Sequence, residues 1–198
     1  VAHGHQLDEL DTVPGVGGHR GDEPVGVLER VAHGEDGSFD LGGISAVVSS
    51  PLQRAYDTAR AAADALGLTV RVDDDLIETD FGEWEGLTFL EAAERHPDLH
   101  GRWLRDTSLA PPGGESFDDV QQRIERVRDR IIADHGPTTV LVVSHVTPIK
   151  TLLRLALGAG SSVLYRLHLD LASLSIAEFY PDNGASVRLV NDTSYLQP

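Results

Sequence analysis

The sequence predicts an α/β protein, a three-layer α/β/α sandwich in which helices cover both faces of a mostly parallel central sheet. From Gly43 onward, short β-branched runs alternate with helical stretches, which is the pattern of such folds. The run 139–144 is almost entirely β-branched or Leu and has no polar face, as expected of a central parallel strand. With 198 residues, the chain has the size of one domain, so we expect a single domain over 1–198.

The first predicted strand is the β-branched run from Ile44 to Val48. An Ala-rich helical stretch follows from Arg54 to Leu66 and ends at Gly67, a residue that suits a helix C-terminus. Leu68 to Val72 is then the second strand. Strand, helix and strand in this order predict one parallel unit.

Two further helices are indicated by their capping residues. Thr88 is expected to cap the first, because Glu91 stands at its third position. The second begins near Ser116 and runs to about Asp134, before Gly136 and a proline stop it.

The last third of the chain contains a helix and a hairpin. The helix is expected from about Pro148 to Leu157, after the buried strand. Two strand-like runs, 173–180 and 186–190, flank the turn sequence 182–184 and predict an antiparallel hairpin.

Residues 1–42 are rich in Gly, Asp and His and lack a clear helical or alternating period, so we assign no structure there. Two similar pieces, 1–4 and 31–34, both read Val-Ala-His-Gly. They are too short to establish a repeat, and we interpret them as a coincidence of composition.

Composition excludes several classes of function. There is no cysteine, which removes disulfides, thiolate nucleophiles and cysteine-based metal sites. The net charge of −16 opposes binding to nucleic acids or anionic membranes, so we expect neither partner. The opening residues lack the layout of an export signal, and we expect a cytoplasmic protein.

The strongest local signal is His145, which ends the buried strand just before a helix. Ligands of open α/β sheets bind beyond the carboxyl ends of strands, and a helix N-terminus attracts anions. His145 therefore lies where a phosphate would bind; a His that only hydrogen-bonds a strand end is the alternative.

Arg54 follows another strand end, after Pro51 near the start of a helix. Its planar guanidinium suits the oxygens of phosphate, and we expect it at the same sheet edge as His145. The alternative is an exposed Arg paired with Asp57.

The segment 78–86 interleaves four carboxylates with Phe81 and Trp84. An apolar wall raises the pKa of a nearby acid, which suits a proton donor to a leaving alkoxide. Spacing alone does not decide which acid has this role. Solvated acidic turns are the alternative, and a metal site lacks a His at a suitable interval.

Together these segments resemble the histidine phosphatase superfamily, also called the phosphoglycerate mutase-like family. More closely, Gly43 to Leu196 is similar to the C-terminal acid phosphatase domain of actinobacterial proteins that also carry a ribonuclease H domain. The resemblance rests on the Ser-Ser-Pro-Leu run before Arg54, the 78–86 run and Ser144-His145, in the family's order.

The resemblance implies a phosphoglycerate mutase-like fold and a phosphohistidine mechanism without a metal or an organic cofactor. Arg54 would clamp the phosphate and His145 would be the second histidine of the pocket. Glu78 would protonate the leaving group and then activate water. His3 is the candidate nucleophile, because His3-Gly4 stands at about the family's distance before Arg54; His33-Gly34 lies too close to the Ile44 strand.

The N-terminus departs from the family, because Ala2 stands where the family has its first phosphate-binding Arg. Either the enzyme has diverged, or residues 1–42 are truncated or read in a disrupted frame; we favour the second, because the periodicity is lost abruptly.

The resemblance implies a phosphatase of small phosphorylated metabolites, of the acid phosphatase or α-ribazole-phosphate phosphatase type. A ribonuclease H domain would then lie upstream in the full-length protein. A phosphoglycerate mutase-type phosphotransferase is the enzymatic alternative, but Arg95 to Arg105 is short for the lid that a mutase uses. A non-catalytic phosphate-binding remnant is the alternative from another class.

Overall fold

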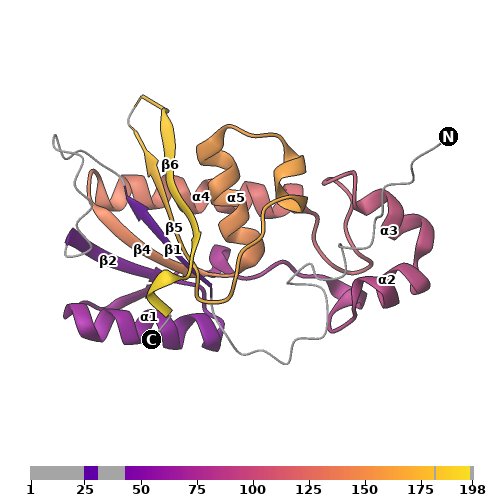
Figure 1. Cartoon of the computed structure of the whole chain (residues 1–198), viewed down its shortest axis with the longest axis horizontal. Helices are drawn as coiled ribbons and strands as arrows, with labels where there is room; N and C mark the ends of the chain where they lie inside the picture. Colours follow the sequence, from indigo (N-terminus) through magenta and orange to yellow (C-terminus); the bar gives the residue numbers. More distant parts are fainter. Residues whose placement is uncertain (1–24, 31–42, 181, 197–198) are drawn as a thin grey trace.

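The computed structural model describes residues 25–30, 43–180 and 182–196. It confirms the predicted three-layer α/β/α architecture (Figure 1). In this part of the chain, the strands are β1 (Val25–Arg30), β2 (Ile44–Ser49), β3 (Val70–Val72), β4 (Thr139–Ser144), β5 (Leu174–Phe179) and β6 (Ala185–Asp192). The α-helices are α1 (Gln53–Leu66), α2 (Phe89–Arg95), α3 (Pro97–Trp103), α4 (Phe117–His135) and α5 (Val146–Leu157). Short 3-10 helices are η2 (Asp74–Leu76), η3 (Gly82–Trp84), η4 (Ser161–Tyr165) and η5 (Ser194–Leu196).

The strands form one sheet in the order β3-β2-β4-β1-β5-β6. β2 pairs in parallel with both β3 and β4, and β5 and β6 form the predicted antiparallel hairpin. β1 lies between β4 and β5, antiparallel to the first and parallel to the second. The sequence analysis assigned no structure to residues 1–42, so β1, which lies at the centre of the sheet, is a strand that it missed.

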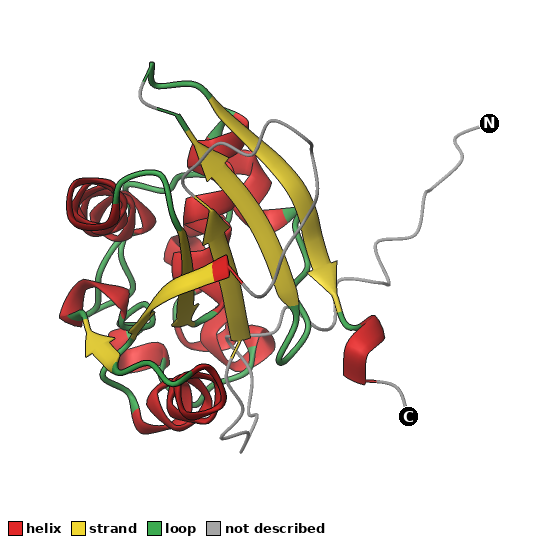
Figure 2. Cartoon of the chain, turned by 90° about the vertical axis from the view of Figure 1, so that its left-hand side faces the viewer, coloured by secondary structure: helices red, strands yellow, loops and turns green. Residues whose placement is uncertain are grey.

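Helices cover both faces of the sheet (Figure 2). Side chains of β2 alternate between the faces, because successive residues of a strand point in opposite directions. Val48 belongs to the core cluster that contains the buried side of α4, whereas Val47 packs with the alanines of α1. α5 packs on β5 through Ile149 and Leu153. α4 and α5 therefore lie on one face, and α1 lies on the other.

A second, smaller core lies at one end of the molecule, where α2 and α3 extend beyond the sheet (Figure 1). It is aromatic, and its ring systems include Trp84 of η3 and Trp103 of α3, which meet edge-on with centroids 5.4 Å apart. The Trp84 indole donates a hydrogen bond of 2.9 Å to His96 Nδ1. This cluster packs the segment after Glu78 against α3, a helix that the sequence did not predict.

The helix starts follow local sequence signals closely. Thr88 and Glu91 form the expected capping box, and Ser116 forms another with Asp119. α5 begins at Val146, slightly earlier than expected, because Pro148 falls in its first turn, where the missing N–H needs no partner. Among the described helices, none is both long and apolar enough to cross a bilayer.

Candidate active site

The ends of β2 and β4 bring two elements of the site together: a serine turn and a histidine. Because the two strands are parallel neighbours, Ser49 pairs with Val143 and the chains leave the sheet at the same edge. Ser50 donates its backbone N–H to the Val143 carbonyl at 2.9 Å. The Ser50 Oγ lies 2.8 Å from His145 Nε2, and both side chains are buried. This contact fixes the orientation of the imidazole.

His145 is the N-terminal cap residue of α5 and carries no positive charge near neutral pH. Burial lowers the pKa of this imidazole to about 3, and the positive charges of Arg54 and Arg123 act in the same direction. Arg54 and His145 follow the ends of the parallel neighbours β2 and β4, which places both residues at the same edge of the sheet. A neutral imidazole at a helix N-terminus can act as a hydrogen-bond partner for an anion.

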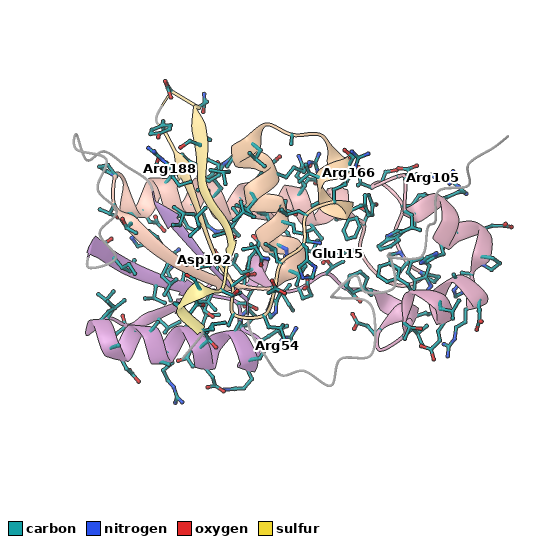
Figure 3. The ribbon with its side chains drawn as sticks, viewed as in Figure 1. Arg54, Arg105, Glu115, Arg166, Arg188 and Asp192 are labelled. Carbon is teal, nitrogen blue, oxygen red and sulfur yellow. The ribbon has the colours of Figure 1, made fainter. Side chains whose placement is uncertain are left out.

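Arg54 lies in the first turn of α1, at the end of the helix toward the middle of the molecule (Figure 3). Its side chain is half-buried. Among the described residues, its guanidinium has no hydrogen bond or salt bridge. Asp57, the partner considered from the sequence, instead accepts a hydrogen bond from Gln53 at 2.9 Å and faces Arg60 at 3.7 Å. The donors of Arg54 are therefore free of carboxylate partners within the described chain.

Glu78 follows η2 and reaches the start of α5. Its Oε1 accepts hydrogen bonds from the backbone N–H of Thr79 at 2.8 Å and of Thr147 at 3.3 Å. Burial raises the pKa of this carboxyl above its ordinary value; these hydrogen bonds and the charge of Arg123 oppose the rise without cancelling it. Because Thr147 is only two residues from His145, the carboxyl and the imidazole occupy the same helix N-terminus.

The other three acids of the segment 78–86 are exposed, and each has a local partner. Asp80 accepts from the Gly82 N–H at 2.8 Å, and Glu85 accepts from the Phe81 N–H at 3.0 Å. Glu83 faces His96 at 3.8 Å. Sequence spacing left the proton donor open among four carboxylates; Glu78 differs from the other three in being partly buried, and burial raises its pKa. Within the described residues, no group of His, Asp and Glu is arranged to hold a metal ion.

Lys150 is a buried cation that the sequence did not single out. It lies one turn after Thr147 on α5, and its Nζ donates to the Leu164 carbonyl at 3.2 Å. Burial lowers the pKa of this amine, and the charge of Glu78 opposes that shift. Among the described residues, Arg123 of α4 and Lys150 of α5 are thus cations whose charges interact with that of Glu78.

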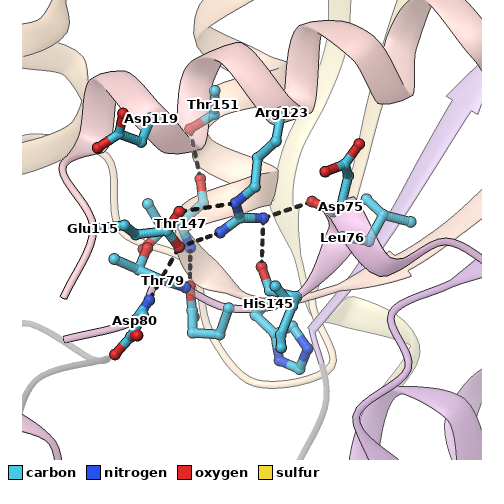
Figure 4. Close-up of polar contacts among 12 residues, drawn as sticks. Asp75, Leu76, Thr79, Asp80, Glu115, Asp119, Arg123, His145, Thr147 and Thr151 are labelled. Carbon is cyan, nitrogen blue, oxygen red and sulfur yellow. Dashed lines mark hydrogen bonds and ion pairs between the residues drawn. The ribbon is translucent and has the colours of Figure 1, made fainter. Parts of the chain in front are cut away.

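Sequence reasoning also missed Arg123 and its partner Glu115. Arg123 is buried on the side of α4 that carries Val120, Ile124 and Val127. It forms a two-point ion pair with Glu115, with Nη2 to Oε1 at 2.7 Å and Nε to Oε2 at 3.1 Å (Figure 4). An arginine within an apolar helix stripe is the signal that could have identified it, because a buried charge requires a partner.

The structure thus brings Arg54, Glu78 and His145 to one edge of the sheet, as the sequence analysis expected. They come from three segments far apart in the chain: the first turn of α1, the turn after η2 and the start of α5. His3, the candidate nucleophile, lies outside the described residues, as does His33.

The fold and the site together define an α/β protein whose candidate site lies beyond the carboxyl ends of parallel strands, where Ser50 and His145 meet and where Arg54 is unpaired among the described residues. Residues 38–193 match the model of the histidine phosphatase superfamily (branch 1). The chain belongs to this superfamily, which confirms the family expected from the sequence.

The relatives in this superfamily include proteins of known name. The chain is 77% identical over 155 residues to a bifunctional protein of Mycobacterium tuberculosis, a match that covers 78% of the chain and 43% of that protein. It is 34% identical over 134 residues to phosphoserine phosphatase 1 of Hydrogenobacter thermophilus, covering 67% of the chain and 64% of that enzyme. The chain therefore spans less than half of its mycobacterial relative.

Solved structures agree with this assignment. The native mycobacterial glucosyl-3-phosphoglycerate phosphatase superposes with a TM-score of 0.67 at 25% identity, over 85% of the chain and 98% of that enzyme. The α-ribazole phosphatase of Shigella flexneri gives a TM-score of 0.63 at 27% identity, over 79% and 75% of the two chains.

Proposed function

We propose that the chain is a phosphatase that hydrolyses small phosphomonoesters through a phosphohistidine intermediate. The observation that carries this proposal is the grouping at one sheet edge of a neutral His145, a Glu78 of raised pKa and an Arg54 that has no partner within the described part of the chain. The phosphatase names of the relatives support it.

The first chemical step is phosphoryl transfer to a histidine nitrogen, with His3 as the candidate nucleophile. Arg54 donates hydrogen bonds to the phosphoryl oxygens, and the positive end of the α5 helix dipole adds favourable potential. The bond from phosphorus to the ester oxygen breaks, and the protonated Glu78 gives its proton to the leaving alkoxide. The raised pKa of Glu78 favours the protonated form that this step requires.

The second step hydrolyses the phosphohistidine. The Glu78 carboxylate accepts a proton from water, the water oxygen attacks phosphorus, and the phosphorus–nitrogen bond breaks. Orthophosphate leaves, and Glu78 is protonated again for the next turnover. His145, held by Ser50, stays neutral and contacts the transferring group as a hydrogen-bond partner.

The proposed substrate class follows from the net charge of the chain and from the cations at the sheet edge. With a net charge of −16, the protein repels polyanions, so a compact phosphomonoester that meets only the local cations is favoured over a nucleic acid. We propose a substrate of the acid phosphatase or α-ribazole-phosphate phosphatase type, which the α-ribazole phosphatase structures support at the level of the fold and family.

We also propose that the chain works in the cytoplasm, beside a ribonuclease H domain that precedes it in the full-length protein. The match to less than half of a bifunctional mycobacterial relative supports an arrangement of more than one domain. Sequencing the complete transcript tests this arrangement; an upstream reading frame without a ribonuclease H sequence would refute it.

The test of activity is the release of p-nitrophenol from p-nitrophenyl phosphate between pH 4 and 8. We expect His145→Ala to lower kcat/KM by about 10²-fold or more, because an oriented hydrogen-bond partner of the phosphoryl group is lost. Glu78→Gln should lower it by about 10²- to 10⁴-fold. Glu83→Gln is the matched control, an exposed acid of the same segment, and should stay within about twofold of the unmodified protein.

Equal, background-level release from the unmodified protein and from His145→Ala would refute the activity. Binding of orthophosphate without any turnover would instead identify the chain as a phosphate-binding remnant.

A further inference from the structure

We propose that Arg123 and Glu115 are positioning residues that hold the Glu78 carboxyl at the start of α5. The inference rests on the proposed function for its catalytic consequence, because Glu78 is the proton donor of that function. Neither residue contacts the phosphate-binding side chains directly among the hydrogen bonds of the described chain. Their effect on the reaction would pass through the backbone on either side of Glu78.

Arg123 fixes the backbone before Glu78. Its Nη1 donates to the carbonyl oxygens of Asp75 at 2.5 Å and of Ile77 at 2.7 Å (Figure 4). The Ile77 carbonyl belongs to the peptide group that leads into Glu78, so this hydrogen bond sets the direction in which the Glu78 side chain leaves the backbone.

Glu115 fixes the backbone after Glu78. Its Oε1 accepts from the Asp80 N–H at 3.0 Å, and its own N–H donates to the Asp80 carbonyl at 2.9 Å. The same Oε1 accepts from Arg123 Nη2 at 2.7 Å. A continuous chain of hydrogen bonds therefore runs from Ile77 through Arg123 and Glu115 to Asp80, and encloses Glu78 and Thr79.

We call this chain of hydrogen bonds through Arg123 and Glu115 the clamp. Close backbone packing adds to it. Gly82 and Gly114 approach so closely that a Cβ on Gly114 would lie 2.3 Å from the Asp80 carbonyl oxygen. The Glu83 N–H also donates to the Pro112 carbonyl at 2.9 Å. The turn that precedes Glu115 thus lies directly against the turn that follows Glu78.

The energetics favour a positioning role over simple stabilisation. The desolvation cost of a buried ion pair often matches its attraction, so such a pair alone is a weak source of stability. Here the Arg123 side chain is 8% exposed, and two of its four hydrogen bonds end on carbonyls of the segment before Glu78, one of them that of the adjacent residue Ile77. Displacement of a catalytic group by about 1 Å can cost about 10²-fold in rate, which gives the clamp a functional value.

Arg123 has a second effect on the same carboxyl through its charge. Its positive charge lowers the pKa of Glu78 against the larger effect of burial. Lys150 on α5 also faces Glu78, and His145 is neutral near pH 7. Because Lys150 and His145 are retained in every variant below, a shift of the pH profile reports on Arg123.

The first readout is kinetic and uses p-nitrophenyl phosphate. Arg123→Lys keeps the charge but loses the two-point geometry. We expect kcat to fall about 10- to 100-fold with KM within about twofold and with the basic limb of kcat/KM unmoved. Arg123→Gln should show a similar fall in kcat. The basic limb of its kcat/KM profile should move to higher pH, because loss of the positive charge raises the pKa of Glu78. Glu115→Gln should lower kcat in the same way.

The matched control is Arg130→Gln, on the same helix. Arg130 pairs with Asp73 and Asp75 of the η2 region but does not bond to the backbone next to Glu78. Its kcat and KM should stay within about twofold of those of the unmodified protein, and its pH profile should not shift.

The second readout is hydrogen exchange of the Thr79 and Thr147 amides, which donate to Glu78 Oε1. Loss of the clamp should speed their exchange about tenfold in Arg123→Gln, the equivalent of one weakened hydrogen bond, while the Ala59 amide of α1 is unchanged. Unchanged exchange at both amides in Arg123→Gln and Glu115→Gln would overturn the inference, as would a loss of activity matched by general unfolding.

Absence of phosphatase activity in the unmodified protein would refute the proposed function alone, because the exchange experiment needs no turnover and still tests the clamp.

Discussion

Replacement of Gly82 by alanine should destabilise the protein by about 2–5 kcal/mol. Gly82 has a φ of +52°, and the left-handed region costs a residue with a Cβ about 1–2 kcal/mol. The added Cβ would lie 2.2 Å from the Pro112 carbonyl oxygen and 2.5 Å from the Gly114 nitrogen, both backbone atoms that no rotamer change can move. Such overpacking costs about 1–3 kcal/mol more.

Gly86→Ala separates the two contributions. Gly86 also has a positive φ, of +73°, but nothing lies within 4 Å of an added Cβ. We therefore expect a loss of about 1–2 kcal/mol, from the backbone conformation alone. Urea denaturation of both variants, with the m-value compared to confirm a two-state transition, measures the difference. If Gly82→Ala is no less stable than Gly86→Ala, the turn at Gly82 does not pack closely against the turn at 112–114.

Three further results are expected. Arg54→Ala should lower kcat/KM for p-nitrophenyl phosphate about 10²- to 10³-fold, and Arg54→Lys should recover only part, since an ammonium lacks the planar pair of donors; equal rates in all three proteins would exclude a phosphate clamp. Glu78→Gln should raise Tm at pH 7, because burial raises the pKa of Glu78 and the ionised form destabilises the fold; this gain should vanish below pH 4.5, where the carboxyl is protonated in the unfolded chain as well, and a gain independent of pH would contradict it. Glu178→Gln should lose about 1–2 kcal/mol at pH 7. Burial would raise the pKa of Glu178, but hydrogen bonds from Tyr180, Arg188 and Ser186 lower it, so its contribution is present above pH 4.5 and fades as pH falls; urea titrations at pH 7 and pH 3.5 with equal losses would refute this sign.

The fold between residues 43 and 196 was largely predictable because its signals are local. β4 has apolar residues on both faces, and the capping boxes at Thr88 and Ser116 mark helix starts within a few residues. Arg54 and His145 were predictable as neighbours because both follow the ends of parallel strands.

Elements that depend on distant contacts were not predictable in this way. β1 obtains its place and direction from pairing with β4 and β5, strands more than a hundred residues later in the chain. α3 is short, and its burial depends on the aromatic cluster around Trp84 and Trp103. Arg123 occurs in an otherwise apolar stripe of α4, and its partner Glu115 is recognisable only once the turn after Glu78 packs against it. Local pattern gives no information on such pairings.

The central claim is that Arg54 and His145 line one phosphate pocket. The most direct test is nuclear magnetic resonance of the His145 imidazole, with ¹⁵N-labelled histidine, during a titration with orthophosphate. We predict that the His145 signals shift in a saturable manner in the unmodified protein, and that Arg54→Ala weakens or abolishes this shift. If orthophosphate saturates the protein while the His145 signals stay in place, or if Arg54→Ala binds it unchanged, the two residues do not share a site.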